Sequence, residues 1–563
     1  MNPSNPIPKL LLLAIFVVAL VPRLIDLDYT RNLDSFHWVS RSQSYVLALA
    51  KGDLAGTLQS SHPGATLMPL AGTSMSVYIG WKLFQDGKSF KNLLDENLSY
   101  VEFNRRFPNA FLFAKIPIAV VTALLIVGIY AVLARLTSPL VATGPGFFLC
   151  VDPFLLGLSR ALHLDAMSSL FAILSILLVV YATDNRCTSP KKVILLGGVF
   201  AGFALLTRSI TLFAIVFAGL ICAGRLLIEI VGEAESWKKH IIKYTTAYAC
   251  FLVTAGAIFF IAFPAMWIEP LAVLNKVFLG PLGLLDSTSD LVTEVDKQIY
   301  FQGDTHLRPN WSFYPLVILY RSTPEMLVLA ALAIFRLLYE WRSSAPTIQA
   351  RRILVSALLL YAVTFTVAMS IFSWKHDRYL LAAFLALDIV AGIELCLLVQ
   401  GCYDFIAKQP PFFQLLSKAL GIALLVFVPS VRLAAIHPNY LTYRDELLFS
   451  AEQARHTFQI GWGEGLHEAA DYLNNKPNAE ALTVGCRTDR HFAPFFRGKT
   501  VDILDVDRDA ELDYLVIPEH NFQTRKNSAI TDPLADISKA EKVITLNGVP
   551  YVRIYRVERG NSN

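Results

Sequence analysis

Long apolar stretches constrain this chain more than any other feature of its sequence. A helix of about 18 or more mostly apolar residues is long enough to cross the roughly 30 Å hydrocarbon core of a bilayer. Such runs cover residues 9–26, 111–135, 138–158, 164–182, 192–207, 209–230, 245–264, 324–340, 352–373, 378–399 and 414–434. Because the long loops leave room for extra helices, we predict a polytopic α-helical membrane protein with about 11–13 transmembrane helices.

The first apolar run is the one that a secretory signal could imitate. Leu10–Leu20 follows Lys9, but the run continues into Val21-Pro22-Arg23 without a small-residue cleavage site. We therefore interpret it as an uncleaved first span.

Composition excludes several other classes of protein. Apolar residues make up 54% and charged residues 17% of the 563, which agrees with a membrane protein. The formal net charge of +4 provides no basic field for nucleic acid. The seven cysteines are scattered without metal-ligand spacing, so we expect no disulfide framework.

The distribution of Lys and Arg predicts the orientation, because short cytoplasmic loops carry an excess of positive charge. One set of short loops holds most of these residues. The opposite set holds only Arg160, Arg208, Lys375 and Arg378. The first set is therefore predicted to be cytoplasmic, and an odd number of spans places the C-terminus on the other side.

This orientation places three long segments on the outer face: residues 27–110, residues 265–323 and everything after about residue 435. Loops of that length are usually functional or separately folded. Beyond residue 435 the composition becomes that of a globular protein, with an amphipathic helix at 464–474 and short strand candidates after it. We predict a transmembrane domain over residues 1–435 and a small soluble extracytoplasmic α/β domain over residues 436–563.

Ionisable side chains gather at the predicted outer face, where charges beside hydrocarbon are costly. The candidates are Asp34 and His62 in the first long loop, Arg160, His163 and Asp165 at the start of a span, and Lys375, Arg378 and Tyr379 in a tight turn. Each group also has a plainer interpretation. Asp34 can cap a helix, His62-Pro63-Gly64 can be an ordinary turn, residues 160–165 can complement a helix dipole, and residues 375–378 can contact lipid headgroups.

The convergence of these groups on one side of the membrane favours chemistry over the separate interpretations. Carboxylates suit general-base activation of a hydroxyl or binding of a divalent cation, whereas Lys, Arg and protonated His suit a phosphate. A site that binds a lipid phosphate and activates an acceptor hydroxyl needs this mixture.

The order of the motifs resembles the GT-C superfamily of polyprenyl-phosphate-sugar-dependent glycosyltransferases. The likeness is strongest to the branch of protein O-mannosyltransferases and lipid A aminoarabinose transferases. The matching segments are Asp34, His62-Pro63-Gly64, His163-Leu164-Asp165, the stretch from Gly198 to Arg208, Trp311 to Pro315, Lys375 to Tyr379, and Gly461 to Leu466. They extend over nearly the whole chain, so the resemblance implies a GT-C-like fold.

The resemblance also implies roles. Asp34 is then the general base that deprotonates an acceptor hydroxyl as it attacks the anomeric carbon, with inversion, while the polyprenyl phosphate leaves. Asp165 matches a second acidic position that organises the site or a metal. Lys375 and Arg378 match a basic turn that contacts the phosphate. Arg160, His163 and Tyr379 complete the substrate-binding set.

Two features depart from the pattern or leave it open. His62 stands where aminoarabinose transferases carry a lysine, and a histidine is charged only part of the time at neutral pH. The resemblance allows, without requiring, a divalent metal such as Mg²⁺ or Mn²⁺ at Asp34 and Asp165, and it implies no other cofactor. The acceptor can be a lipid, a glycan or a protein.

Two other functions are compatible with a multi-span chain of this kind. A flippase for a lipid-linked glycan is the main alternative, but transporters often show repeated halves and mid-membrane polar groups, whereas this chain has its charges at helix ends. An oligosaccharide ligase or polymerase is a third candidate. Gly198 and Gly202 have the spacing of close helix packing. The glycine-rich stretch 461–466 follows no clear strand and lacks a phosphate-loop lysine, so we reject a nucleotide site there.

Overall fold

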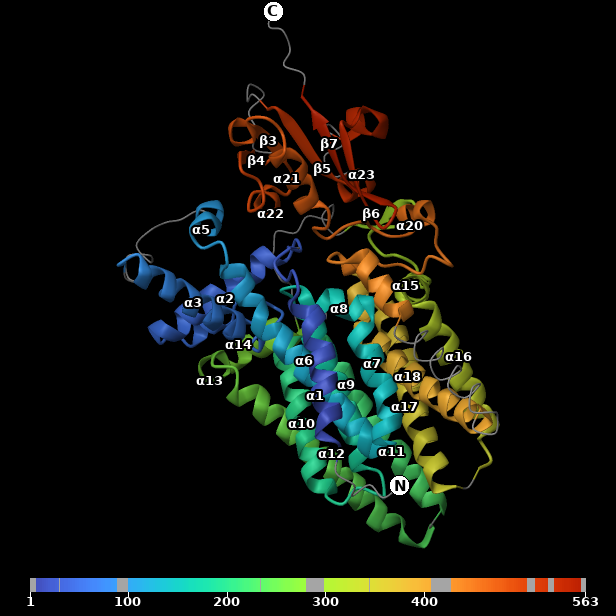
Figure 1. Cartoon of the computed structure of the whole chain (residues 1–563). Coiled ribbons are helices and arrows are strands. Elements are labelled where there is room, and N and C mark those ends of the chain that lie inside the picture. Colours follow the sequence, from blue (N-terminus) through green and yellow to red (C-terminus); the bar gives the residue numbers. More distant parts are fainter. Residues whose placement is uncertain are drawn as a thin grey trace, which may run out of the picture.

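The computed structural model describes residues 7–29, 31–88, 100–232, 234–279, 298–343, 345–406, 427–503, 512–524 and 531–557. It consists of a helical bundle, a group of shorter helices beside its upper end, and a sheet-containing region above it (Figure 1). The chain is mostly helical, as predicted.

Seven helices of the described part are long and apolar enough to cross a membrane, or nine if each of two bent helix pairs counts as one span. The seven are α6 (Ala110–Leu136), α9 (Asp165–Ala182), α10 (Pro190–Thr207), α11 (Leu212–Gly232) with the short turn before it, α12 (Trp237–Ile261), α17 (Pro346–Ile371) and α18 (Leu381–Ile406) with the turn before it. The prediction of a multi-span helical protein is therefore confirmed. Of the eleven predicted spans, the first forms α1 (Lys9–Leu24), a helix of 16 residues, and most of the last lies outside the described residues.

The two bent pairs are broken where proline follows a capping residue. The chain bends by 56° between α7 (Pro139–Val151) and α8 (Pro153–Arg160). It bends by 112° between α15 (Phe313–Arg321) and α16 (Pro324–Tyr339). Asp152 accepts a hydrogen bond from the Leu155 N–H, and Thr323 accepts one from the Met326 N–H, so each side chain caps the second helix of its pair. These breaks turn α8 and α15 across the upper end of the bundle (Figure 1).

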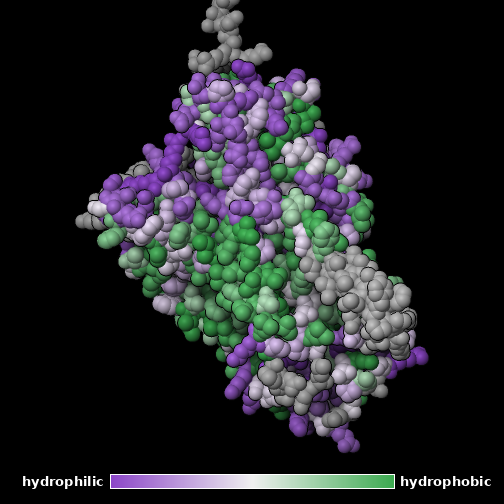
Figure 2. Space-filling model, viewed as in Figure 1, coloured by the Kyte–Doolittle hydropathy of each residue, from purple (hydrophilic) through white to green (hydrophobic). Residues whose placement is uncertain are grey.

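On the face shown in Figure 2, a hydrophobic belt covers the bundle between two hydrophilic ends. Large apolar side chains such as Leu124, Val216 and Val363 are more than half exposed there. By contrast, α9 is buried along nearly its whole length, because α6, α10, α11 and α18 pack around it. The exposed belt is the surface that hydrocarbon would cover.

The region above the bundle contains one five-stranded sheet with the order β4-β3-β5-β7-β6. Strand β3 (Thr483–Cys486) is parallel to β4 (Lys499–Val501) and β5 (Tyr514–Pro518), whereas β7 (Val549–Arg556) is antiparallel to β5 and to β6 (Lys542–Leu546). Asn547 and Gly548 both have positive φ in the β6–β7 turn, as the Asn-Gly pair predicts. Helices α20 (Ala451–Thr457), α21 (Leu466–Asn474), α22 (Asp489–Phe492) and α23 (Glu519–Thr524) accompany the sheet.

The first long loop lies beside the upper end of the bundle. It contains α2 (Ser35–Lys51), α3 (Leu67–Gln85) and α5 (Tyr100–Arg106), and α13 (Ala265–Ile268) and α14 (Pro270–Leu274) of the second long loop lie beneath them (Figure 1). A two-stranded hairpin, β1 (Ile299–Phe301) and β2 (Asp304–His306), follows in the second loop and packs against Phe458. The loops thereby enclose a space between the bundle and the sheet region.

Candidate active site

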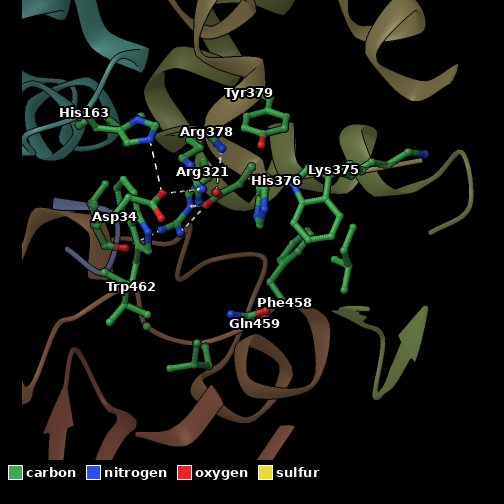
Figure 3. A pocket seen from close by; sticks show the side chains of 18 of the residues that line it. Asp34, His163, Arg321, Lys375, His376, Arg378, Tyr379, Phe458, Gln459 and Trp462 are labelled. Carbon is green, nitrogen blue, oxygen red and sulfur yellow. Dashed lines mark hydrogen bonds and ion pairs between the residues drawn. The ribbon is translucent and has the colours of Figure 1, made fainter. Parts of the chain in front are cut away.

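A cavity of about 480 Å³ lies between the upper end of the bundle and the sheet region. Side chains from both regions line it, and Figure 3 shows part of this lining, including Asp34, His163, Arg321, Lys375, His376, Arg378, Tyr379, Phe458, Gln459 and Trp462. The cavity therefore collects residues that are more than 400 positions apart in the sequence.

Asp34 lies immediately before α2, yet within the described residues its carboxylate makes no capping hydrogen bond to that helix. Instead, its Oδ2 lies 3.4 Å from His163 Nε2 and 3.2 Å from Arg378 Nη2 (Figure 3). The side chain is 35% exposed, so one side of the carboxylate remains open to the cavity. The capping interpretation of Asp34 is thus not supported, and its carboxylate is accessible to a ligand.

Asp165 lies behind this layer as the first residue of α9, and its side chain is only 3% exposed. It forms an ion pair with Arg208, its Oδ2 lies 2.8 Å from His163 Nδ1, and the same oxygen lies 3.5 Å from Arg378 Nε. His163 therefore stands between the two carboxylates, and Arg378 also contacts both. Since Asp165 is buried, it orients His163 and Arg378, which both contact Asp34.

The charges of this cluster set the protonation of Asp34. Burial raises the pKa of Asp34, but the hydrogen bond from His163 and the charge of Arg378 lower it more, so the pKa lies well below its usual range. The carboxylate is therefore ionised at neutral pH.

Three histidines around the cavity are neutral at pH 7. Burial, with nearby arginine charges, lowers the pKa of His62 to about 3 and that of His376 to about 3. Burial also lowers the pKa of His163 to about 4, against the favourable hydrogen bond with Asp34. The positive charge of the cavity is consequently supplied by arginine and lysine.

Two predicted cations do not point at Asp34. Lys375 is buried, and its ammonium donates hydrogen bonds to the carbonyls of Pro309 and Asn310 at 2.9 and 3.2 Å, on the side away from Asp34 (Figure 3). Arg160 donates to the carbonyls of Pro22, Ile25 and Asp26 and does not line the cavity. Both side chains join loops to the bundle, so Arg378 is the residue of the basic turn that faces the carboxylates.

The structure adds residues that the sequence did not single out as site candidates. Arg208 pairs with Asp165 and lies 4.3 Å from the Tyr379 ring centre, and Arg321 pairs with Asp377 at 2.6 Å. Trp462 of the sheet region covers Arg378 at 4.4 Å. Arg208 ends the Gly198–Arg208 motif, which was a usable signal. Trp462 lies in the Gly461–Leu466 segment of the resemblance, which was a similar signal. Arg321 offered none, because nothing in its local sequence indicates which distant loops it meets.

The carboxylates of Asp34 and Asp165 do not fit a divalent cation. Each already faces a guanidinium, and His163 lies between them. Across the described residues no cluster of three or more His, Cys, Asp or Glu side chains is suited to a metal. Cations occupy the positions that a metal would need, so we carry the metal hypothesis no further.

The long apolar helices and the charged cavity at one end define a multi-pass membrane protein with a polar site at one end of its bundle. More particularly, residues 77–269 match the model of the family described as dolichyl-phosphate-mannose-protein mannosyltransferase. The match confirms the resemblance noted in the sequence. The matched segment includes His163, Asp165 and Arg208, whereas Asp34 and Arg378 lie outside it.

Three solved structures are similar over long stretches. ArnT from Cupriavidus metallidurans, in the apo state, shares 13% identity with a TM-score of 0.46 over 96% of this chain and 97% of its own. The oligosaccharyltransferase AglB from Archaeoglobus fulgidus shares 11% identity with a TM-score of 0.42 over 94% and 72%. The Pmt1-Pmt2 complex of S. cerevisiae shares 20% identity with a TM-score of 0.34 over 53% and 38%. A search of curated proteins gives no significant match.

Proposed function

We propose that this chain is an integral membrane glycosyltransferase that moves a sugar from a polyprenyl-phosphate donor to an acceptor hydroxyl. The observation that carries the proposal is the ionised, partly open carboxylate of Asp34 beside Arg378 in a large cavity. The match to a family named for its dolichyl-phosphate-mannose donor supports a lipid-phosphate sugar as the substrate.

The proposed reaction is a single displacement. The acceptor hydroxyl gives its proton to the Asp34 carboxylate while its oxygen forms a bond to the anomeric carbon of the sugar. The bond between that carbon and the phosphate oxygen breaks, and the electron pair leaves with the polyprenyl phosphate. Since the nucleophile attacks opposite the leaving group, the configuration inverts. Arg378 balances the charge that develops on the phosphate.

The cavity is proposed to face away from the cytoplasm. The connection between α16 and α17 lies at the opposite end of the bundle (Figure 1). The ends of the two helices that it joins are basic, with Arg336 in α16 and Arg351 and Arg352 in α17. By the positive-inside rule, that end is cytoplasmic. The acceptor, whether lipid, glycan or protein, would then meet the donor at the outer face, below the sheet region.

The test is consumption of a defined donor. Purified full-length protein in liposomes would be incubated with a panel of polyprenyl-phosphate sugars and a cell-envelope extract that supplies acceptor hydroxyls, and mass spectrometry would follow free polyprenyl phosphate. Release of polyprenyl phosphate from one sugar class supports the transferase. Movement of intact donor between leaflets, without cleavage, would favour the flippase instead. Consumption only of oligosaccharide diphosphate lipids would favour the ligase or polymerase.

Replacing His62 with Gln should leave donor binding nearly unchanged. Because the pKa of His62 is lowered to about 3, the imidazole is neutral at pH 7 and contributes no charge to a phosphate. We expect the donor Kd to change by less than about threefold, measured by titration of a fluorescent lipid phosphate. A large loss of affinity in His62→Gln that His62→Lys restores would mean that the residue is cationic when donor binds.

Replacing Lys375 with Met should lower stability and leave donor affinity intact. The substitution keeps the apolar stem but leaves the buried Pro309 carbonyl and the partly buried Asn310 carbonyl without their donor, at a cost of about 1–3 kcal/mol. The measurement is the thermal unfolding midpoint, alongside donor Kd. An unchanged unfolding midpoint with weakened donor binding would show that Lys375 contributes to the phosphate site.

A further inference from the structure

The glycine-rich turn at residues 461–465 has no function in the reaction as proposed so far, although it forms part of the cavity wall. We propose that it is a positioning element of the active site, in which the backbone fixes the segment before Asp34 and the Trp462 ring fixes Arg378. This inference rests on the proposed function, and it makes the sheet region a working part of the active site.

The backbone contacts concentrate on Leu33, the residue before Asp34. Its N–H donates to the Trp462 carbonyl at 2.8 Å, and its carbonyl accepts from His491 Nε2 at 2.9 Å. Burial lowers the pKa of His491 to about 4, so the imidazole is neutral at pH 7 and its Nε2 must carry the proton that it donates. Both backbone groups of Leu33 are therefore held by the sheet region.

Neighbouring residues extend this attachment. His467 Nδ1 lies 2.8 Å from the Tyr29 carbonyl, and the Arg31 guanidinium lies 5.3 Å from the Phe495 ring centre. The chain between the first span and Asp34 is thus joined to the sheet region at several points. The position of the Asp34 carboxylate follows from this attachment as much as from α2.

Three glycines allow the turn to approach so closely. Gly461, Gly463 and Gly465 all have positive φ, of 87°, 123° and 86°. A Cβ on Gly463 would lie 2.2 Å from the Arg31 carbonyl oxygen, whereas among the described residues a Cβ on Gly461 would meet only Tyr551, at 3.6 Å. The two glycines share a backbone that disfavours side chains, but only Gly463 touches the segment that leads to Asp34.

The ring of Trp462 contacts Arg378 and His163, the two side chains that lie against both carboxylates. It lies 4.4 Å from the Arg378 guanidinium carbon and 5.1 Å from the His163 ring centre, edge to face (Figure 3). The backbone N–H of Trp462 donates to Glu464 Oε2 at 2.5 Å, which fixes the turn. A guanidinium that packs against an indole face keeps its charge but has less conformational freedom. Trp462 thereby limits where Arg378 can present its N–H groups.

A double-mutant cycle tests whether Trp462 acts through Arg378. We expect Trp462→Leu to lower kcat/KM for the donor about tenfold and Trp462→Phe to restore most of it, since Phe keeps an aromatic face. In an Arg378→Gln background, Trp462→Leu should have little further effect. Equal fractional losses in both backgrounds would overturn the positioning role. If the wild-type chain releases no polyprenyl phosphate from any donor, the proposed function fails first, and that result is distinct.

A second measurement does not depend on activity. Hydrogen exchange of the backbone at residues 31–36 should speed up in Gly463→Ala, because the new methyl group would displace Arg31. In the matched Gly461→Ala variant, exchange should change less, although the backbone strain is similar. Equal exchange rates in the two variants, with both proteins folded, would show that the turn does not hold the Asp34 segment.

Discussion

Asp34→Asn is expected to lower sugar transfer by about 10²- to 10⁴-fold while leaving the donor bound, because the amide keeps the shape of the carboxylate but cannot take a proton. Its oxygen can still accept the hydrogen bond from His163, so the local packing is preserved. Single-turnover release of polyprenyl phosphate, together with donor Kd, measures the two effects separately.

The control for this substitution is Asp86→Asn. Asp86 lies on the surface after α3 and contacts only Lys82, at 4.0 Å, among the ion pairs of the described residues. The Asp86→Asn substitution removes one carboxylate without changing the cavity, so activity should stay near that of the wild type. If Asp34→Asn also transfers sugar at a near wild-type rate, Asp34 is not the base.

Much of the fold follows from properties that a sequence displays locally. Span length predicts most transmembrane helices because hydrocarbon thickness is fixed, and Asn547-Gly548 predicts a hairpin because both positions need positive φ. The breaks at Pro153 and Pro324 were less predictable. Proline disrupts a helix, but the angle of the break depends on what the second helix packs against.

The candidate site was predictable to the extent that topology brings helix ends together. Asp34, His163, Asp165 and Arg378 were expected on one face, and the structure places them in one cluster. The separate roles of residues within one turn were harder to predict. Lys375 and Arg378 carry the same charge, but only contacts with distant carbonyls and carboxylates show which of them faces the cavity.

The contacts of the sheet region with the Asp34 segment depend on long-range packing. The Gly461–Leu466 stretch was part of the resemblance, but local residues could not reveal that this turn meets Leu33. A contact between residues more than 400 positions apart is set by how whole regions pack. Such contacts must be read from the structure.

Arg378→Gln is expected to weaken donor binding about 10- to 100-fold, which corresponds to the loss of one charged hydrogen bond to the phosphate. Arg378→Lys should recover part of the affinity, since it keeps the charge but not the forked geometry. The donor Kd is measured for both variants and for Lys375→Met, which removes a nearby cation. The comparison shows whether donor affinity depends on the charge at position 378 or on the total charge of the turn. Unchanged affinity in Arg378→Gln would remove the arginine from the phosphate site.

The same substitution should move the pH profile. In the resting site His163 and Arg378 hold the pKa of Asp34 well below its usual range, so the base is ionised down to low pH. Without Arg378 that pKa rises toward the ordinary value near 4, and the acidic limb of kcat/KM shifts to higher pH. A proton acceptor with so low a pKa is a weak base. A donor phosphate that draws Arg378 away from Asp34 would raise the pKa of Asp34 and make it a stronger base. Donor binding would thereby be coupled to activation of the acceptor. An acidic limb that stays in place in Arg378→Gln would argue against this coupling.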